Sequence, residues 1–92
     1  MTLKSYTENH TVDMDTYLYG VGMGISWANA TLRAQHQQPL FCSPGQLVLH
    51  QANYISLLDG EIARFKAAGV LKDSMHIEAI MVAALQDAFP CK

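Results

Sequence analysis

Residues 13–35 read DMDTYLYGVGMGISWANATLRAQ, and the spacing of their apolar side chains predicts an α-helix. Apolar residues recur at alternating intervals of four and three, which places them on one helix face; they are Met14, Leu18, Val21, Ile25, Ala28 and Leu32. Asp13 is a favourable N-cap residue. Tyr17, Tyr19, Met23 and Trp27 widen the apolar arc, so we expect this helix to be the most buried element. Polar residues, Asn29 and Arg33 among them, fall on the opposite side.

Three glycines, Gly20, Gly22 and Gly24, lie inside this predicted helix. Each destabilises a helix interior by about 1 kcal/mol relative to alanine, so their presence needs a reason. We expect another helix to approach closely over Gly20, Gly24 and Ala28, which share a face. A phosphate-binding loop is disfavoured, because such loops follow a strand and open a helix. A break in the helix at the glycines remains an alternative.

Two further helices are predicted downstream. One covers residues 50–68, with Gly69 as its C-terminal stop and an inward line of Gln51, Ile55, Leu58, Ile62 and Phe65. The other begins at Asp73 or Ser74 and reaches about Asp87, and Pro90 prevents its continuation. In the segment that joins the first predicted helix to the helix at residues 50–68, Ser43 either caps a short helix or precedes an extended stretch at residues 47–49.

These elements predict an all-α fold, a small bundle of three main helices stapled by one disulfide. Residues 13–92 form a single helical domain in this prediction. Residues 1–12 are polar and lack periodicity, so we expect a loose N-terminal arm.

The only two cysteines, Cys42 and Cys91, stand in the segments Phe41-Cys42-Ser43-Pro44 and Ala88-Phe89-Pro90-Cys91. Two cysteines in a chain of 92 residues favour one disulfide, and a loop of this size stabilises the fold by about 4 kcal/mol in the chain-entropy model. The alternative is a pair of reduced, buried cysteines that act as small hydrophobic residues. A disulfide favours an oxidising compartment. We expect a periplasmic protein if a leader has been removed and a cytoplasmic one otherwise.

Composition excludes several classes of function. The net charge is −2 and the chain has no run of lysine or arginine, which argues against nucleic acid as a partner. No apolar stretch reaches the roughly 18 residues of a membrane span. Hydrophobic residues make up 50% of the chain and charged residues only 15%, so excess apolar surface favours an interface. We therefore expect a homodimer, with Tyr19, Met23 and Trp27 as its candidate contact.

The sequence contains no convincing catalytic or metal-binding motif. The four histidines are spread along the chain without the i, i+4 spacing of a helical metal site. A nucleophilic Cys42 would need His36 or His50 as its base. Glu61 and Arg64 have the spacing of an ordinary surface ion pair. We expect no enzyme activity, no cofactor and no metal.

Several segments together resemble the Rap/Tai immunity proteins. The similarity lies in Tyr19-Gly20-Val21-Gly22, in the Phe41-Cys42-Ser43-Pro44 turn, in Gln51, and in the closing Ala83-Ala84-Leu85 and Ala88-Phe89-Pro90-Cys91, over residues 13–91. Members of that family are small, exported, helical bacterial proteins with a disulfide. The best-known ones bind and block peptidoglycan amidase effectors delivered by type VI secretion. The resemblance implies that Cys42 and Cys91 form the disulfide.

The function that we expect is therefore a non-catalytic immunity protein that binds and inhibits a secreted peptidoglycan amidase. The candidate partner-binding loop is the polar connector at residues 35–50, with His36, Gln37, Gln38 and Gln46. The alternative is a helical accessory protein that binds a small apolar ligand or another protein, with Trp27, Met23 and the tyrosines lining the site. A periplasmic chaperone is a weaker third hypothesis, because this chain carries few charges.

Overall fold

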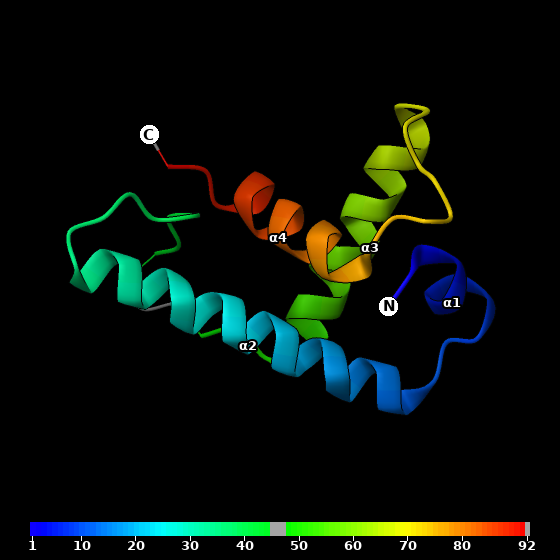
Figure 1. The fold of residues 1–92 in the computed structure, drawn as a ribbon, viewed down its shortest axis with the longest axis horizontal. Helices are drawn as coiled ribbons and strands as arrows, with labels where there is room; N and C mark the ends of the chain where they lie inside the picture. Colours follow the sequence, from blue (N-terminus) through cyan, green and yellow to red (C-terminus); the bar gives the residue numbers. More distant parts are fainter. Residues whose placement is uncertain (45–47, 92) are drawn as a thin grey trace.

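The protein folds as an all-helical bundle. The computed structural model describes residues 1–44 and 48–91 (Figure 1). Its helices are α1 (Leu3–Glu8), α2 (Val12–Ala34), α3 (Gln51–Ala67) and α4 (Ile77–Ala88). The three longer helices pack against one another, and a disulfide joins Cys42 to Cys91. The predicted fold class is confirmed. None of the helices in the described ranges has both the length and the hydropathy that a membrane span requires.

The most buried helix is α4, not α2 as the sequence suggested. Five of its side chains are buried, and α4 packs on both α2 and α3; the five are Ile77, Ile80, Met81, Ala84 and Leu85. Only Leu18, Gly22 and Asn29 are buried on α2. The wide apolar arc of α2 extends past its neighbours into solvent, where Tyr17 is 46% exposed and Trp27 69% exposed.

The predicted helix boundaries hold to within a few residues, and the differences have local causes. α2 is capped by Thr11 rather than Asp13, because the Thr11 hydroxyl accepts a hydrogen bond from the Met14 amide at 3.2 Å. α3 ends as predicted at Gly69, whose φ of +73° suits the position after a helix. The amide of Val70 donates back to the carbonyl of Phe65, which completes this C-terminal motif.

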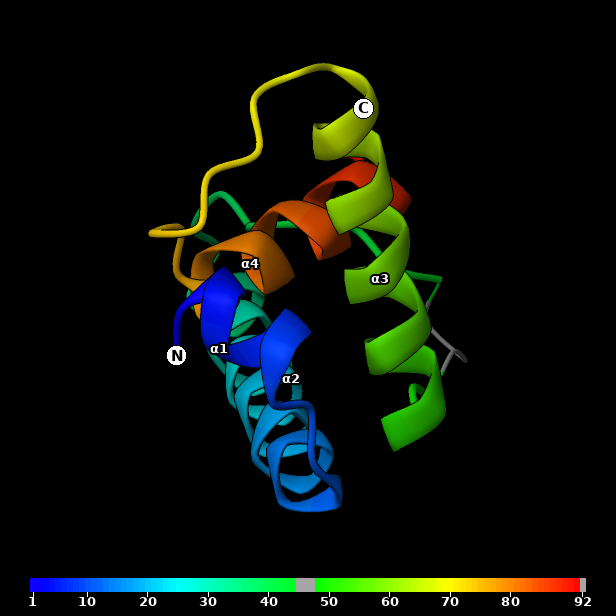
Figure 2. The ribbon, with the colours of Figure 1, turned by 90° about the vertical axis from the view of Figure 1, so that its right-hand side faces the viewer.

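The segment 1–12 is not a loose arm. Leu3 and Tyr6 of α1 are buried in the core, and the Tyr6 hydroxyl donates to Asp59 of α3 at 2.8 Å. The Leu3 amide donates to the carbonyl of Met75, and the amide of Ile77 donates to the carbonyl of Met1, both at 2.8 Å. Figure 2 shows α1 beside the segment that leads into α4. These backbone contacts hold residues 73–76 outside the helix, so α4 begins at Ile77 rather than near Asp73.

Close packing on α2 occurs at one glycine, and it is not one of the expected pair. A Cβ atom built on Gly22 would lie 2.4 Å from the ring of Tyr54, whereas at Gly20 and Gly24 nothing lies within 4 Å. The neighbour is a tyrosine ring of α3 rather than a helix backbone. The helix continues without a break through all three glycines.

The buried face of α3 also differs from the face that the spacing of its apolar residues predicted. The buried residues are Tyr54, Leu58 and Glu61, while Ile55 and Ile62 are only partly buried. Glu61 is 3% exposed and is therefore not the ordinary surface residue that its spacing to Arg64 indicated.

Candidate partner-binding groove

The disulfide predicted from the two cysteine segments is present and fixes the middle of the 35–50 connector. Cys42 and Cys91 have a Cα–Cα distance of 5.0 Å. Beside the bond, the Cys42 amide donates to the carbonyl of Phe89 at 2.8 Å. The rings of Phe41 and Phe89 lie 6.3 Å apart between centroids, within the range of aromatic contacts. The connector is thereby tied to the C-terminus both covalently and by packing.

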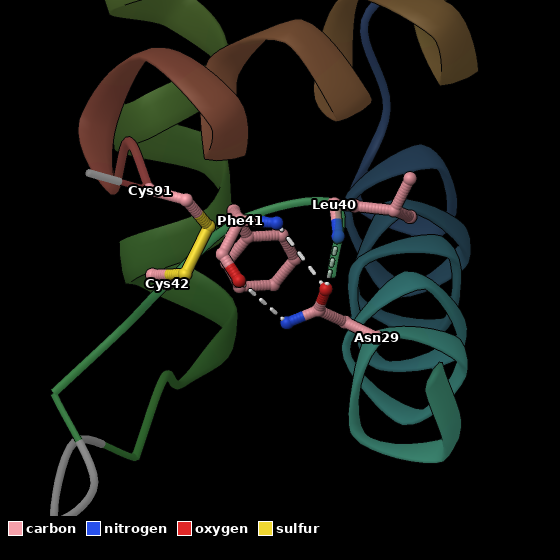
Figure 3. The surroundings of a disulfide bond; sticks show 5 residues. All are labelled: Asn29, Leu40, Phe41, Cys42 and Cys91. Atoms are coloured by element: carbon pink, nitrogen blue, oxygen red, sulfur yellow. Dashed lines mark hydrogen bonds between the residues drawn. A yellow bond between two sulfur atoms is a disulfide. The ribbon is translucent and has the colours of Figure 1, made fainter. Parts of the chain in front are cut away.

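Asn29 ties the same part of the connector to α2. Its side-chain oxygen accepts from the amides of Leu40 and Phe41, at 2.6 and 3.2 Å, and its side-chain nitrogen donates to the Phe41 carbonyl at 2.9 Å (Figure 3). Asn29 is 4% exposed. Three hydrogen bonds from one buried amide hold the backbone at residues 40–41 in a single position.

The beginning of the connector follows a standard helix-ending motif. The His36 amide donates to Arg33, and the Gln37 amide donates to Leu32, in the pattern of a Schellman motif. His36 takes the left-handed conformation, with φ of 57°, at the position where glycine is usual. His36, Gln37 and Gln38 are all exposed. Gln46, the fourth residue of the candidate loop, lies outside the described residues.

A groove opens between α2, the connector and the start of α3, and we call it the α2–connector groove. Its volume is about 300 Å³. It is lined by Met23, Ser26, Trp27, Asn29, Ala30, Arg33, Phe41, Ser43, Val48, Leu49 and Tyr54. Trp27 on α2 and Val48 on the connector are 69% and 70% exposed. Large apolar side chains this exposed beside a concavity are typical of binding sites.

The floor of the groove is polar at one point and rigid. The hydroxyls of Ser26 and Tyr54 lie 2.7 Å apart, in a hydrogen bond between α2 and α3. The Tyr54 ring is 2% exposed and lies directly on Gly22. The absence of a side chain at Gly22 therefore lets the Tyr54 ring pack directly against α2.

Three of the residues predicted for the partner-binding loop, His36, Gln37 and Gln38, do not line this groove. They stand at the C-terminal end of α2, while the lining comes from the later part of the connector and from the α2 face itself. Of the residues proposed for an apolar ligand site, Trp27, Met23 and Tyr54 line the groove, whereas Tyr17 and Tyr19 do not.

An ionisable cluster lies elsewhere, between α3 and α4. Arg64 Nη1 contacts Glu61 Oε1 at 3.0 Å and Asp87 Oδ2 at 3.1 Å. Glu61 Oε2 is buried and has no hydrogen-bond partner among the described residues. Burial raises the pKa of Glu61 to about 7, and the Asp87 carboxylate adds to this rise while Arg64 opposes it. One cation thus serves two carboxylates, and this arrangement is suited to holding a proton.

The chemistry of the remaining candidates is limited. The disulfide leaves Cys42 without the thiolate that a nucleophile requires. Over residues 1–44 and 48–91, no cluster of histidine, cysteine or carboxylate side chains has the geometry to hold a metal ion. The burial of Asn29 and the contact between Gly22 and Tyr54 were not identified from the sequence.

Comparisons of the chain with protein-family models, with curated proteins and with solved structures gave no match.

Proposed function

We propose that this protein is a non-catalytic binding protein that captures a partner protein in the α2–connector groove. The observation that carries the proposal is the pair Trp27 and Val48, two exposed apolar side chains that line the same cavity from α2 and from the connector. The connector is held in place at residues 40–42 before any partner arrives, because Asn29 and the disulfide fix it there. A pre-organised site loses less entropy on binding.

The partner that we propose is a secreted peptidoglycan amidase, which the protein would inhibit as an immunity protein in the periplasm. The support for this step is the resemblance of the two cysteine segments to the Rap/Tai immunity proteins. The disulfide is compatible with an oxidising compartment. The exposed His36, Gln37 and Gln38 lie at the end of α2 next to the groove residue Arg33 and are proposed as the polar rim of the interface.

The size of the molecule is sufficient for this role. A standard interface buries about 800 Å² on each partner. The solvent-accessible surface of this protein measures 5855 Å², so an interface of that size would cover only a small part of the molecule. Interfaces of this kind depend on a few central aromatic residues, and Trp27 has the required position and exposure.

The test is co-expression with a peptidoglycan amidase encoded beside this gene, with growth and complex formation as the two measurements. Trp27→Ala and Val48→Ser should weaken the complex at least about 30-fold each, the effect of removing a residue worth 2 kcal/mol. Val70→Ser is the matched control, because Val70 is 49% exposed and does not line the groove. If growth is not rescued and no complex forms, the amidase proposal is wrong. A complex that is equally sensitive to all three changes would contradict the groove as its site.

A homodimer is the competing proposal, in which Trp27 contacts a second copy of this chain instead of a different protein. Tyr19 and Met23 pack partly on the core, so Trp27 is the largest free apolar group of the expected dimer contact. Light scattering at micromolar concentration separates the two uses. A mass near 10.2 kDa at every concentration excludes the homodimer, while a doubled mass that Trp27→Ala returns to the monomer would support it.

A further inference from the structure

The α2 wall of the groove is a single stripe that ends in a cation. Met23, Trp27 and Ala30 are followed by Arg33, at intervals of four, three and three, so all lie on one side of the helix. With a rise of 1.5 Å per residue, Trp27 and Arg33 are about 9 Å apart along the helix axis. The groove is therefore apolar along most of its length and positive at the end nearest the connector's beginning.

Among the described residues that line the groove, Arg33 is the only charged one. No carboxylate of the described residues lies within ion-pair distance of its guanidinium. The whole chain has a net charge of −2, so this positive end is a local feature. A guanidinium in this position favours a carboxylate, which it can bind through two parallel hydrogen bonds.

The shape of the site favours an extended chain as its occupant. An extended chain advances about 3.3 Å per residue, and side chains two residues apart in such a chain point to the same side. Two residues therefore cover about 7 Å of the roughly 9 Å from Trp27 to Arg33, and the long side chain of arginine can reach the rest of the way. The volume of the groove, about 300 Å³, suits one or two side chains and is too small for a whole helix, which is about 10–12 Å across.

We infer that the groove binds an extended segment of the partner protein in which an apolar side chain lies between Trp27 and Val48 and a nearby carboxylate pairs with Arg33. This inference rests on the proposed function and specifies the part of the partner that the groove recognises. It follows from charge complementarity at Arg33 and from the apolar stripe beside it.

The probe for this inference is a pentapeptide, acetyl-Ala-Leu-Ser-Glu-Ala-amide, read by the fluorescence of Trp27. Trp27 is the single tryptophan of the chain, so its emission reports on the groove alone. The peptide should shift this emission to shorter wavelength, and the analogue with glutamine in place of glutamate should bind at least five-fold more weakly. Added salt should weaken the glutamate peptide and leave the glutamine peptide nearly unchanged.

Three variants make the test specific to Arg33. Arg33→Gln should abolish the preference for glutamate, and Arg33→Glu should reverse it in favour of a lysine peptide. Lys72→Gln removes an equal charge from an exposed position outside the groove and should keep the preference. Both positions are exposed, so circular dichroism should show an unchanged fold for all three variants.

The outcomes distinguish this inference from the proposal on which it rests. No preference for glutamate over glutamine up to 5 mM peptide, or a preference that survives Arg33→Gln, overturns the inference. Octanoate that shifts the Trp27 emission as strongly as the peptide also overturns it, in favour of a small-molecule site. If the amidase complex forms and needs Trp27 but is indifferent to Arg33→Gln, the proposed function stands and this inference fails.

Discussion

Gly22 and Gly24 lie two residues apart on the same helix, and we expect alanine at these positions to have opposite effects on stability. A Cβ atom at Gly22 would lie 2.4–2.7 Å from three atoms of the Tyr54 ring, closer than carbon atoms can approach. The ring cannot move aside freely, because it is 2% exposed and its hydroxyl is bonded to Ser26. At Gly24 nothing lies within 4 Å of the added atom.

The magnitudes follow from two opposing effects. Alanine in place of a helical glycine stabilises the helix by about 1 kcal/mol, and Gly24→Ala should show this gain in full. Overpacking typically destabilises by about 1–3 kcal/mol. A contact as short as that at Gly22 falls at the upper end of this range, so Gly22→Ala should destabilise by about 2 kcal/mol after the helix gain is subtracted.

The assay is thermal unfolding followed by circular dichroism. For a domain of this size 1 kcal/mol corresponds to a change in Tm of about 4–8 °C. Gly24→Ala should therefore raise Tm by about 4–8 °C and Gly22→Ala should lower it by about 8–16 °C. Gly22→Ala should also change the Trp27 emission, because Tyr54 forms the floor of the groove that Trp27 lines. Equal Tm values for the two variants would refute the contact between α2 and Tyr54.

Three further changes test the other contacts. Reduction of the Cys42–Cys91 bond, whose partners are separated by 49 residues, should destabilise the protein by about 4 kcal/mol in the chain-entropy model; two thiols alkylated in native protein without reductant would show that the bond is absent. The folded-state pKa of Glu61 is raised to about 7 from 4.5, so the protonated carboxyl stabilises the fold fully below about pH 4.5 and this stabilisation is lost as the pH rises through 7. Glu61→Gln should therefore reduce the change in unfolding free energy over this pH range, measured with urea, by about 1–3 kcal/mol. An unchanged pH profile in the variant would contradict the raised pKa. Asn29→Ala should destabilise by about 2–4 kcal/mol, because it leaves buried backbone groups of Phe41 without partners, whereas a loss below about 0.5 kcal/mol in the same experiment would show that water replaces the amide.

Features that depend on neighbours in sequence could be predicted. The period of apolar residues located α2, α3 and most of α4, since amphipathic helices repeat within a few residues. Gly69 was identifiable as a helix end because its conformation is one that glycine adopts easily. The disulfide could be predicted because the chain offers only one pair of cysteines.

Features that depend on distant partners could not be predicted. α1 is short and mostly polar, and its burial depends on backbone hydrogen bonds to residues 73–77, which no local pattern reveals. Asn29 was predicted to lie on the solvent-exposed side of α2, because an argument from apolar periodicity assigns every polar side chain to that side. Its burial follows from the backbone groups of the connector, which need partners once they leave water.

The candidate site was predicted in part for the same reason. Trp27 and Met23 were identified as residues that could line a ligand site, because they are apolar and lie outside the single apolar stripe that packs on the core. The polar rim at residues 36–38 was selected from composition and lies beside the groove rather than in it. Tyr54 of the groove packs on Gly22, and these residues are separated by more than thirty positions and meet only in the folded chain.

The disulfide closes residues 42–91 into a covalent ring, and this has a consequence for damage by proteases. A single cut anywhere inside the ring leaves both pieces attached, so the nick would be visible only after reduction. α3 and α4 lie within the ring, whereas α2 lies outside it. One cut between residues 35 and 41 would therefore break the covalent link between α2 and the rest of the groove, and only hydrogen bonds, such as those of Asn29 and Ser26, and side-chain packing would hold α2 in place. In a compartment rich in proteases, the short stretch before Cys42 is the most vulnerable part of the binding site.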